Sequence, residues 1–286
     1  MKDANLATLE VVKYVVKRFG LHMNKRLGQN FLIRPDVVAQ IAETADLKSG
    51  DPVLEIGPGI GTLTQALAET GAAVTAVEID SHLLPVLDKT LEHYDNVRII
   101  HGDILKTDIA ELMGHKPFKV CANLPYYITT PIIMTLLEER LPMERLVVMV
   151  QKEVAERMTA SPGSRIYGAL SVAVQYYTQP EIIFEIPPKA FMPAPEVTSA
   201  VVCLDVRKEP PVSVMEEKRF FQVVKAAFSQ RRKTFANTLK AAGVSKDGVA
   251  AILADCGIEG SRRGETFSLD EFAAIADAWT RYNKKQ

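Results

Sequence analysis

The sequence contains little cysteine and no long apolar run. Its three cysteines are scattered along 286 residues, and an odd, scattered set indicates reduced thiols without a disulfide framework. The five histidines show no ligand spacing, so no metal is expected. No run approaches the roughly 20 apolar residues that cross a membrane, and acids near the start do not fit a signal or transit peptide. These absences predict a cytoplasmic protein with neither a membrane nor a metal partner.

The chain also lacks a net charge of either sign, and its basic residues are unevenly distributed. The formal net charge of −1 argues against a uniformly basic nucleic-acid binder. Residues 11–34 and 218–240 nevertheless carry many basic residues and no acid. We interpret these stretches as local contacts for phosphates, with two solvated helix faces as the alternative. The candidate contacts are Lys25, Arg26, Arg231, Arg232 and Lys233.

What the sequence does contain is a series of short apolar runs that alternate with helical patterns. Alternating strands and helices predict a doubly wound, Rossmann-like α/β sheet. The expected strands are 51–56, 73–79, 97–101, 118–122 and 145–151, and the expected helices are 5–19, 36–45, 62–70, 81–94, 129–139, 152–159 and 167–177. Short connections predict that 182–186 and 199–205 close the sheet as an antiparallel pair. The chain from Met215 onward is helical in pattern, so we expect domains at 1–208 and 209–286.

A glycine-rich turn, Gly57-Pro58-Gly59-Ile60-Gly61, joins the first expected strand of the sheet to the next helix. Glycines let the backbone approach a ligand closely, and the helix N-terminus offers free N–H groups. The G-x-G-x-G spacing differs from the dinucleotide motif, and it favours a carboxylate over a pyrophosphate. Glu78 follows about twenty residues later, where a carboxylate binds ribose hydroxyls. This pattern predicts an adenosine-bearing ligand, with a plain helix-capping turn as the alternative.

Four successive expected strands end in residues that suit one ligand crevice. These residues are Gly57, Glu78, Asp103 and Asn123. The carboxyl ends of parallel strands meet at one edge of a sheet, so the four are expected to converge. Asp103 stands where it could accept a hydrogen bond from an adenine amino group.

The tetrapeptide Asn123-Leu124-Pro125-Tyr126 ends the fourth of these strands. Pro125 fixes its own φ and holds Leu124 extended. The Asn123 amide oxygen and the Leu124 carbonyl then form two neighbouring acceptors beside the Tyr126 ring. This arrangement suits a planar group with an exocyclic NH2. Taken alone, the four residues also fit a strand-terminating turn with a core tyrosine.

A proline-rich loop at 187–195 is expected to be stiff and to display Phe191. The alternative is that Phe191 is a core aromatic that anchors this loop.

Eight motifs occur in order: LGQNFL (27–32), EIGPGIGTLT (55–64), VEID (77–80), GD (102–103), NLPY (123–126), QKEVAERM (151–158), SRIYGALSV (164–172) and FMPAPEVTSAVV (191–202). With them the chain resembles the S-adenosylmethionine-dependent rRNA adenine N6-dimethyltransferases, most closely the bacterial KsgA type that acts on small-subunit rRNA. The resemblance runs from about residue 24 to 204, with weaker similarity in FSQRRKTFANTL (228–239).

The resemblance implies a role for each matched residue. Gly57 would pass near the methionine part of S-adenosylmethionine, Glu78 would bind its ribose and Asp103 its adenine. The implied donor-binding set is Asn30, Leu32, Gly57, Gly59, Glu78, Asp103 and Asn123. In the implied catalytic set, Asn123 and Leu124 accept hydrogen bonds from the target N6 amino group. Tyr126 and Phe191 pack on the flipped base.

The implied reaction is the N6,N6-dimethylation of two adjacent adenosines in the 3′-terminal hairpin loop of 16S rRNA, in ribosome biogenesis, by a monomer. The adenine N6 is a poor nucleophile and the donor is already activated, so catalysis would consist of positioning and electrostatics. The 164–172 and 151–158 motifs favour this type over the large-subunit enzymes that confer macrolide resistance. The intact Glu78, Asp103, Asn123 and Tyr126 argue against the other alternative, a non-catalytic RNA-binding factor. A DNA adenine methyltransferase lacks support, because no DNA-recognition domain is evident.

Overall fold

The computed structural model describes residues 4–21 and 29–284. The chain divides into two compact units. The first unit comprises Met1–Ala155 and Gln179–Val206, and the second comprises Glu156–Thr178 and Arg207–Gln286.

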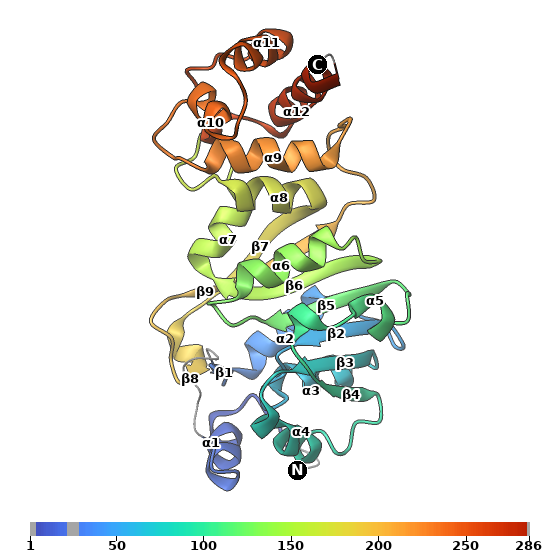
Figure 1. Ribbon diagram of the computed structural model, residues 1–286. Helices are drawn as coiled ribbons and strands as arrows, with labels where there is room; N and C mark the ends of the chain where they lie inside the picture. The colour runs from blue at the N-terminus through green and yellow to red at the C-terminus, as the bar shows by residue number, and fades with distance from the viewer. Residues whose placement is uncertain (1–3, 22–28, 285–286) are drawn as a thin grey trace. The chain divides into compact units, whose positions relative to one another are not determined.

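A seven-stranded sheet forms the first unit, in the order β4-β3-β2-β5-β6-β9-β7 (Figure 1). The pairs from β4 through β6 are parallel, and β9 is antiparallel to β6. The strands are β2 (Pro52–Ile56), β3 (Ala73–Glu78), β4 (Val97–His101), β5 (Phe118–Asn123), β6 (Met143–Gln151), β7 (Thr178–Ile186) and β9 (Ser199–Val206). The predicted doubly wound α/β fold is confirmed. The order reverses between β2 and β5, and ligands of such sheets bind at the strand ends beside this point.

Most helices of this unit lie where the apolar spacing predicts them. The helices are α1 (Leu9–Arg18), α2 (Pro35–Thr44), α3 (Thr62–Glu69), η2 (Ser81–Leu83), α4 (Leu84–Thr90), η3 (Ile104–Lys106), α5 (Ile109–Leu112), α6 (Thr129–Glu138), α7 (Lys152–Thr159) and η4 (Pro188–Ala190). Of these, η3, α5 and η4 were not predicted. Proline suits the first turn of a helix because its missing N–H would have no partner there. Pro35 accordingly begins α2, and Pro85 lies in the first turn of α4.

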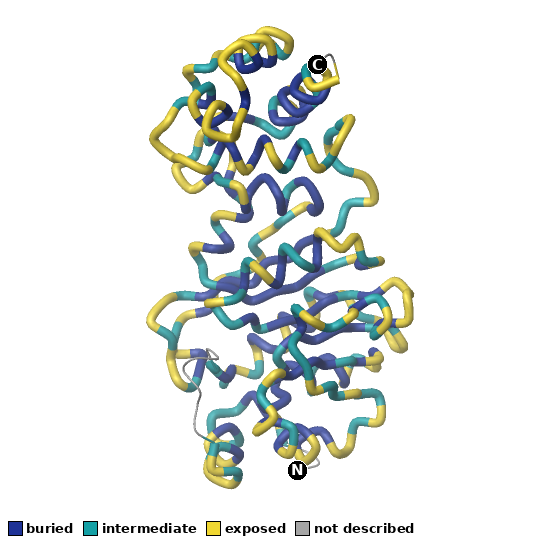
Figure 2. Tube along the Cα trace, in the orientation of Figure 1, coloured by how far each residue is buried: buried dark blue, intermediate teal, exposed yellow. Residues whose placement is uncertain are grey.

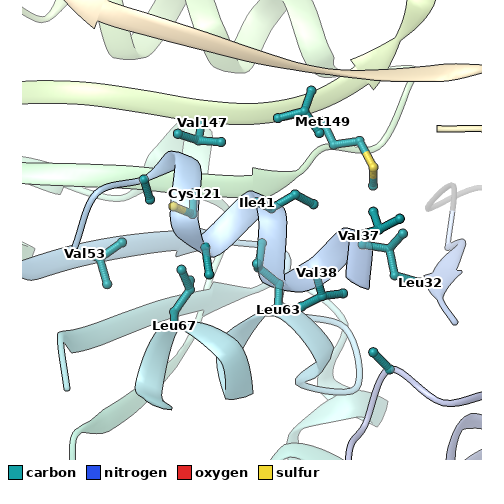
Figure 3. Packing of buried hydrophobic residues seen from close by; sticks show 14 of the residues in the cluster. Leu32, Val37, Val38, Ile41, Val53, Leu63, Leu67, Cys121, Val147 and Met149 are labelled. Carbon is teal, nitrogen blue, oxygen red and sulfur yellow. The ribbon is translucent and has the colours of Figure 1, made fainter. Parts of the chain in front are cut away.

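The core of the first unit lies between this sheet and two helices, α2 and α3 (Figure 3). Alternate residues of a strand point to one face, and Val147 and Met149 of β6 accordingly both belong to this core. Ile41 of α2 and Leu63 of α3 pack in the same cluster. Residues 146–150 are completely buried, as expected for a strand whose two faces are both covered (Figure 2).

A second, two-stranded sheet was not predicted. It pairs β1 (Phe31–Leu32) with β8 (Phe191–Met192) in antiparallel register, with Leu32 opposite Phe191. It brings the segment before α2 together with the proline-rich loop, although the two are far apart in the sequence. Both Leu32 and Phe191 join the hydrophobic core.

The second unit is helical. Its elements include α8 (Ala169–Tyr177), α9 (Glu217–Phe228), α10 (Phe235–Ala241), α11 (Lys246–Cys256), η5 (Gly264–Thr266) and α12 (Leu269–Lys284). Tyr176 and Tyr177 of α8 pack on Phe220 and Phe221 of α9, with ring centroids 4.8 and 5.5 Å apart. Both tyrosine hydroxyls donate to Glu217, over 3.2 and 3.0 Å. These contacts explain why Glu156–Thr178 belongs to this unit, whereas the sequence reading places it in the domain 1–208.

Candidate active site

The glycine turn lies at the carboxyl end of β2. Gly57, Gly59 and Gly61 have φ values of +70°, +62° and +92°, which L side chains rarely adopt. At Gly59 an added Cβ would also lie 3.1 Å from the Phe31 ring. The Gly57 N–H donates to the Val77 carbonyl over 3.0 Å, which joins the turn to β3. The positive φ values and the close approach of the Phe31 ring explain why glycine is needed here.

Glu78 ends β3 with its carboxyl group held by the backbone. The side chain is buried, with 4% of its surface exposed. Its Oε2 accepts from the Gly59 N–H over 3.1 Å, and its Oε1 accepts from the Asp80 N–H over 2.8 Å. Burial raises the pKa of Glu78, and these two N–H groups act to lower it. The carboxyl orientation is therefore fixed before any ligand arrives.

A second carboxyl, that of Glu55 in β2, is more deeply buried and only 1% exposed. Its Oε2 bonds no group in the part of the chain that the structure describes. Burial raises the pKa of Glu55 to about 8, and the charge of Glu78 adds to the effect. Buried carboxyls without partners are costly, so an acid in the apolar run of β2 is a sequence signal for a site, and the sequence reading did not use it.

Asn123 and Leu124 present two oxygens at the end of β5. The Asn123 Nδ2 donates to the Asn30 carbonyl over 3.2 Å, which leaves Oδ1 as the accepting end of this amide. The Leu124 N–H donates to the Met149 carbonyl over 3.2 Å. Within residues 4–21 and 29–284, no donor bonds the Leu124 carbonyl. Neither oxygen is therefore occupied by a donor of the described residues; Asn123 lines the pocket described below, whereas Leu124 is buried and does not.

The two tyrosines that follow differ in their surroundings. The Tyr126 hydroxyl lies 2.7 Å from Ser199 Oγ at the start of β9, and burial raises the pKa of Tyr126. Tyr126 is thus tethered and half-buried. Tyr127 is 57% exposed and lines the pocket described next.

One pocket collects residues from the ends of β2, β3 and β5 and from the segment before α2. Six of the seven predicted donor-binding residues line it: Asn30, Leu32, Gly57, Gly59, Glu78 and Asn123. The remaining lining residues are Gln29, Phe31, Glu55, Pro58, Thr62, Leu63, Ile79, Leu83, Pro125 and Tyr127. Three of the four strand ends that the sequence predicts to converge, those of β2, β3 and β5, therefore meet at this pocket.

Asp103, the seventh predicted residue, does not line this pocket. It follows β4 and caps η3, because its Oδ1 accepts from the Leu105 N–H over 3.1 Å. Lys106 Nζ lies 3.5 Å from its Oδ2. Its contact with adenine stays a prediction.

Phe191 is only 3% exposed. The expectation that the proline-rich loop displays this ring is therefore wrong for the structure described here. The reason is the pairing of β8 with β1, which places Phe191 opposite Leu32 in the core. Its position agrees with the alternative of a loop-anchoring aromatic, and its packing on a target base stays a prediction.

The predicted phosphate contacts fall in two places. Arg231, Arg232 and Lys233 are exposed between α9 and α10 of the second unit, and the Arg231 guanidinium donates to the Arg165 carbonyl. Lys25 and Arg26 lie outside the described residues.

Besides Glu55, the sequence reading missed three residues that shape the pocket. Gln29 donates from Nε2 to Asp80 Oδ2 over 2.8 Å, which ties the segment before α2 to the loop after β3. The other two missed residues are Ile79, which is 50% exposed although it is apolar, and Tyr127. Ile79 follows Glu78 directly and Tyr127 follows the tetrapeptide, so their signal is adjacency to the two motifs.

Two kinds of feature are absent from residues 4–21 and 29–284. No three His, Cys, Asp or Glu side chains are grouped so that they could hold a metal ion. No helix in these ranges has the length and apolar character needed to span a membrane.

Comparison with known proteins agrees with this geometry. The family model described as Ribosomal RNA adenine dimethylase matches residues 20–279. Ribosomal RNA small subunit methyltransferase A of Bacillus licheniformis is 48% identical over 285 residues, which cover 96% of this chain and 97% of that protein. A dimethyladenosine transferase structure from Plasmodium falciparum is 27% identical with a TM-score of 0.74, covering 89% of this chain and 98% of that one. The 23S rRNA methyltransferase ErmE is 28% identical with a TM-score of 0.69, covering 88% and 100%.

The chain belongs to the ribosomal RNA adenine dimethylase family. It is an S-adenosylmethionine-dependent methyltransferase that acts on rRNA adenine.

Proposed function

We propose that this member of the ribosomal RNA adenine dimethylase family dimethylates N6 of two adjacent adenosines in the 3′-terminal hairpin loop of 16S rRNA. The observation that carries the proposal is the pocket at the switch point of the sheet. There Glu78, the glycine turn and the Asn123 amide meet, and Leu124 follows Asn123 directly in the chain. The full-length similarity to a small-subunit enzyme supports the choice of RNA.

The residues of the pocket suit the methyl donor. The donor bears an ammonium and a sulfonium, and Glu55, which lines the pocket, offers a buried oxygen that no described residue bonds. Glu78, held by two backbone N–H groups, keeps lone pairs for ribose hydroxyls. Gly57 has nothing within 4 Å of the position of an added Cβ, so a ligand can approach its backbone. When bound, the donor supplies an activated methyl group.

The chain's own contribution to the reaction is the positioning of the target base. Asn123 Oδ1 and the Leu124 carbonyl accept the two N6 hydrogens, which favours a pyramidal nitrogen whose lone pair faces the methyl group. The tether from Tyr126 to Ser199 Oγ holds the ring as a stacking surface, and each stacked aromatic is worth ~1–3 kcal/mol. After methyl transfer, the nitrogen loses its proton to water, either directly or along a route beside the Asn123 side chain. Catalysis is then positioning plus electrostatics.

The target adenosine has to leave its stack to reach the pocket, which is easiest in a hairpin loop. We propose that the exposed Arg231, Arg232 and Lys233 contact phosphates of the rRNA. The notion that Lys25 and Arg26 do the same rests on the sequence alone. In the same proposal the protein acts as a monomer in the cytoplasm, where bacteria assemble small subunits.

One observation favours a second candidate, which is methylation of large-subunit rRNA. The structure of ErmE, a 23S rRNA methyltransferase, covers 88% of this chain at 28% identity. The 48% identity to a small-subunit enzyme outweighs it.

The test is radiolabelled methyl transfer from S-adenosylmethionine onto unmodified small subunits and, separately, onto naked large-subunit rRNA, followed by nucleoside mass analysis. The proposal predicts dimethyladenosine confined to the small subunit. Label on large-subunit rRNA alone would support the second candidate. A product that stops at monomethyladenosine would contradict dimethylation, and bound RNA without label would indicate a non-catalytic factor.

A further inference from the structure

The second unit contains a groove that the proposed reaction does not use. It has a volume of about 570 Å³, and it lies between α9, the end of α10 and α12. Its lining residues are Arg219, Gln222, Lys225, Ala226, Ser229, Gln230, Ala241, Ala242 and Trp279. Two of these side chains are cationic, three more are polar, and none of the described lining residues is acidic.

Arg219 is the lining residue that most strongly indicates a ligand. Its guanidinium lies over the Trp279 ring, 4.7 Å from the centroid, and its Nη1 donates to Gln222 Oε1 over 2.7 Å. Its Nε is buried and bonds no atom of the described residues. An arginine offers five N–H donors. Among the described residues, a ring and one neutral oxygen hold this guanidinium, and its Nε donor has no acceptor.

Arg262 in the same unit provides an internal comparison. Its guanidinium lies 4.5 Å from the centroid of the Phe267 ring, which is nearly the same arrangement. It also forms a two-point ion pair with Glu271, through Nη1 and through Nη2 at 2.9 Å. Arg219 has the aromatic ring, but no carboxylate of the described residues pairs with it. The missing element is thus an anionic oxygen, which a ligand would supply.

The arrangement of the lining residues along α9 shows which anion fits. Arg219, Gln222, Ala226 and Ser229 are spaced i, i+3, i+7 and i+10 along the chain, so they share one face of α9. At about 1.5 Å of rise per residue, the line is about 15 Å long. Lys225 lies beside it in the same groove. A groove of this length with two cationic side chains, those of Arg219 and Lys225, matches an extended strand of phosphates better than one small anion.

The groove is also continuous in sequence with the proposed rRNA contact. Gln230 is its last lining residue on this side, and the exposed Arg231, Arg232 and Lys233 follow at once. The small side chains of Ala226, Ala241 and Ala242 leave room for a backbone to lie in the groove.

We propose that this groove binds the sugar–phosphate backbone of an RNA strand, with the Arg219 guanidinium donating to one phosphate and Lys225 pairing with a neighbouring one. The proposal rests on the proposed function, because rRNA is the polyanion that this enzyme meets.

The test uses the full-length protein with Lys225→Gln, and with Lys246→Gln as its control. Lys246 begins α11, is exposed and does not line the groove, so the control makes the same charge change elsewhere in the unit. The affinity for unmodified small subunits and for naked small-subunit rRNA is measured across a salt series. We expect Lys225→Gln to weaken both about tenfold, the value of one charge-assisted hydrogen bond. The slope of log affinity against log salt should fall by about 1, and Lys246→Gln should change neither.

A second variant, Arg219→Lys, keeps the charge and removes the planar fork. It is expected to lose affinity for the RNA as well, and a thermal melt checks that the unit stays folded. Unchanged affinity and slope in Lys225→Gln would overturn the proposal. Weaker binding to subunits with unchanged binding to naked rRNA would also overturn it, in favour of an acidic protein partner. Nucleoside analysis of the wild-type product is run in parallel, so that a failure of the proposed function is seen separately.

Discussion

The pocket of the first unit and the groove of the second differ in how they present polar groups. In the pocket, the carboxyls of Glu55 and Glu78 are buried, and two backbone N–H groups hold Glu78. In the groove, the cations lie on helical faces and the Lys225 side chain is exposed. Rigid, buried groups suit a small ligand of defined shape, whereas exposed cations suit a long polyanion whose binding depends on salt. The difference indicates a division of tasks between the two units.

The largest effect is expected from the acceptor at the end of β5. Asn123→Ala removes an oxygen that is used only when the target base is in place, so methyl transfer should fall by at least about a hundredfold. Binding to small subunits should stay the same, since RNA affinity comes from the cationic surface. Labelled transfer and subunit binding are measured on one preparation. Asn123→Asp keeps an accepting oxygen and should retain more activity than the alanine variant; equal loss would contradict the role of Oδ1.

The next effect concerns the pH dependence of stability that Glu55 introduces. Its pKa is about 8 in the folded chain against 4.5 as the ordinary value. Below pH 4.5 both states hold the proton. Between these values the unfolded chain releases it and the folded chain keeps it, so the free energy of unfolding should fall with rising pH by about 1.4 kcal/mol per unit. Glu55→Gln should lack this decline.

Chemical denaturation across this pH range measures the Glu55 effect. Glu138→Gln makes the same change on the exposed surface of α6 and serves as the control. A wild-type curve parallel to that of Glu55→Gln would show that the buried carboxyl is not protonated.

A smaller effect separates Glu78 from Asp103, which the family resemblance treats alike. Glu78→Gln replaces the fixed carboxyl in the pocket and should weaken S-adenosylhomocysteine binding about tenfold, as for the loss of one charged hydrogen bond. Asp103→Asn should weaken it less, because Asp103 caps η3 and does not line the pocket. Calorimetric titration measures both. An equal loss of affinity in the two variants would show that Asp103 contributes to the donor site as Glu78 does.

Local signals in the sequence predicted most of the sheet and six of the residues that line the pocket. Strand ends after short apolar runs placed Glu78 and Asn123, and the glycine spacing placed the turn, because each depends on neighbours in the chain. The pairing of β1 with β8 could not be predicted, since it joins distant residues through two short strands. For that reason the sequence favoured a displayed Phe191 over the core aromatic that was its alternative. The packing of Tyr176 and Tyr177 on α9, which places Glu156–Thr178 in the second unit, is equally non-local.

The most direct test of the division of tasks measures two affinities on two variants. Glu78→Gln and Lys225→Gln are each titrated with S-adenosylhomocysteine and with unmodified small subunits. The account predicts that Glu78→Gln loses affinity for the donor product alone, and that Lys225→Gln loses affinity for the subunit alone. If either variant weakened both ligands equally, with the fold intact by thermal melting, the assignment of separate tasks to the pocket and the groove would be contradicted.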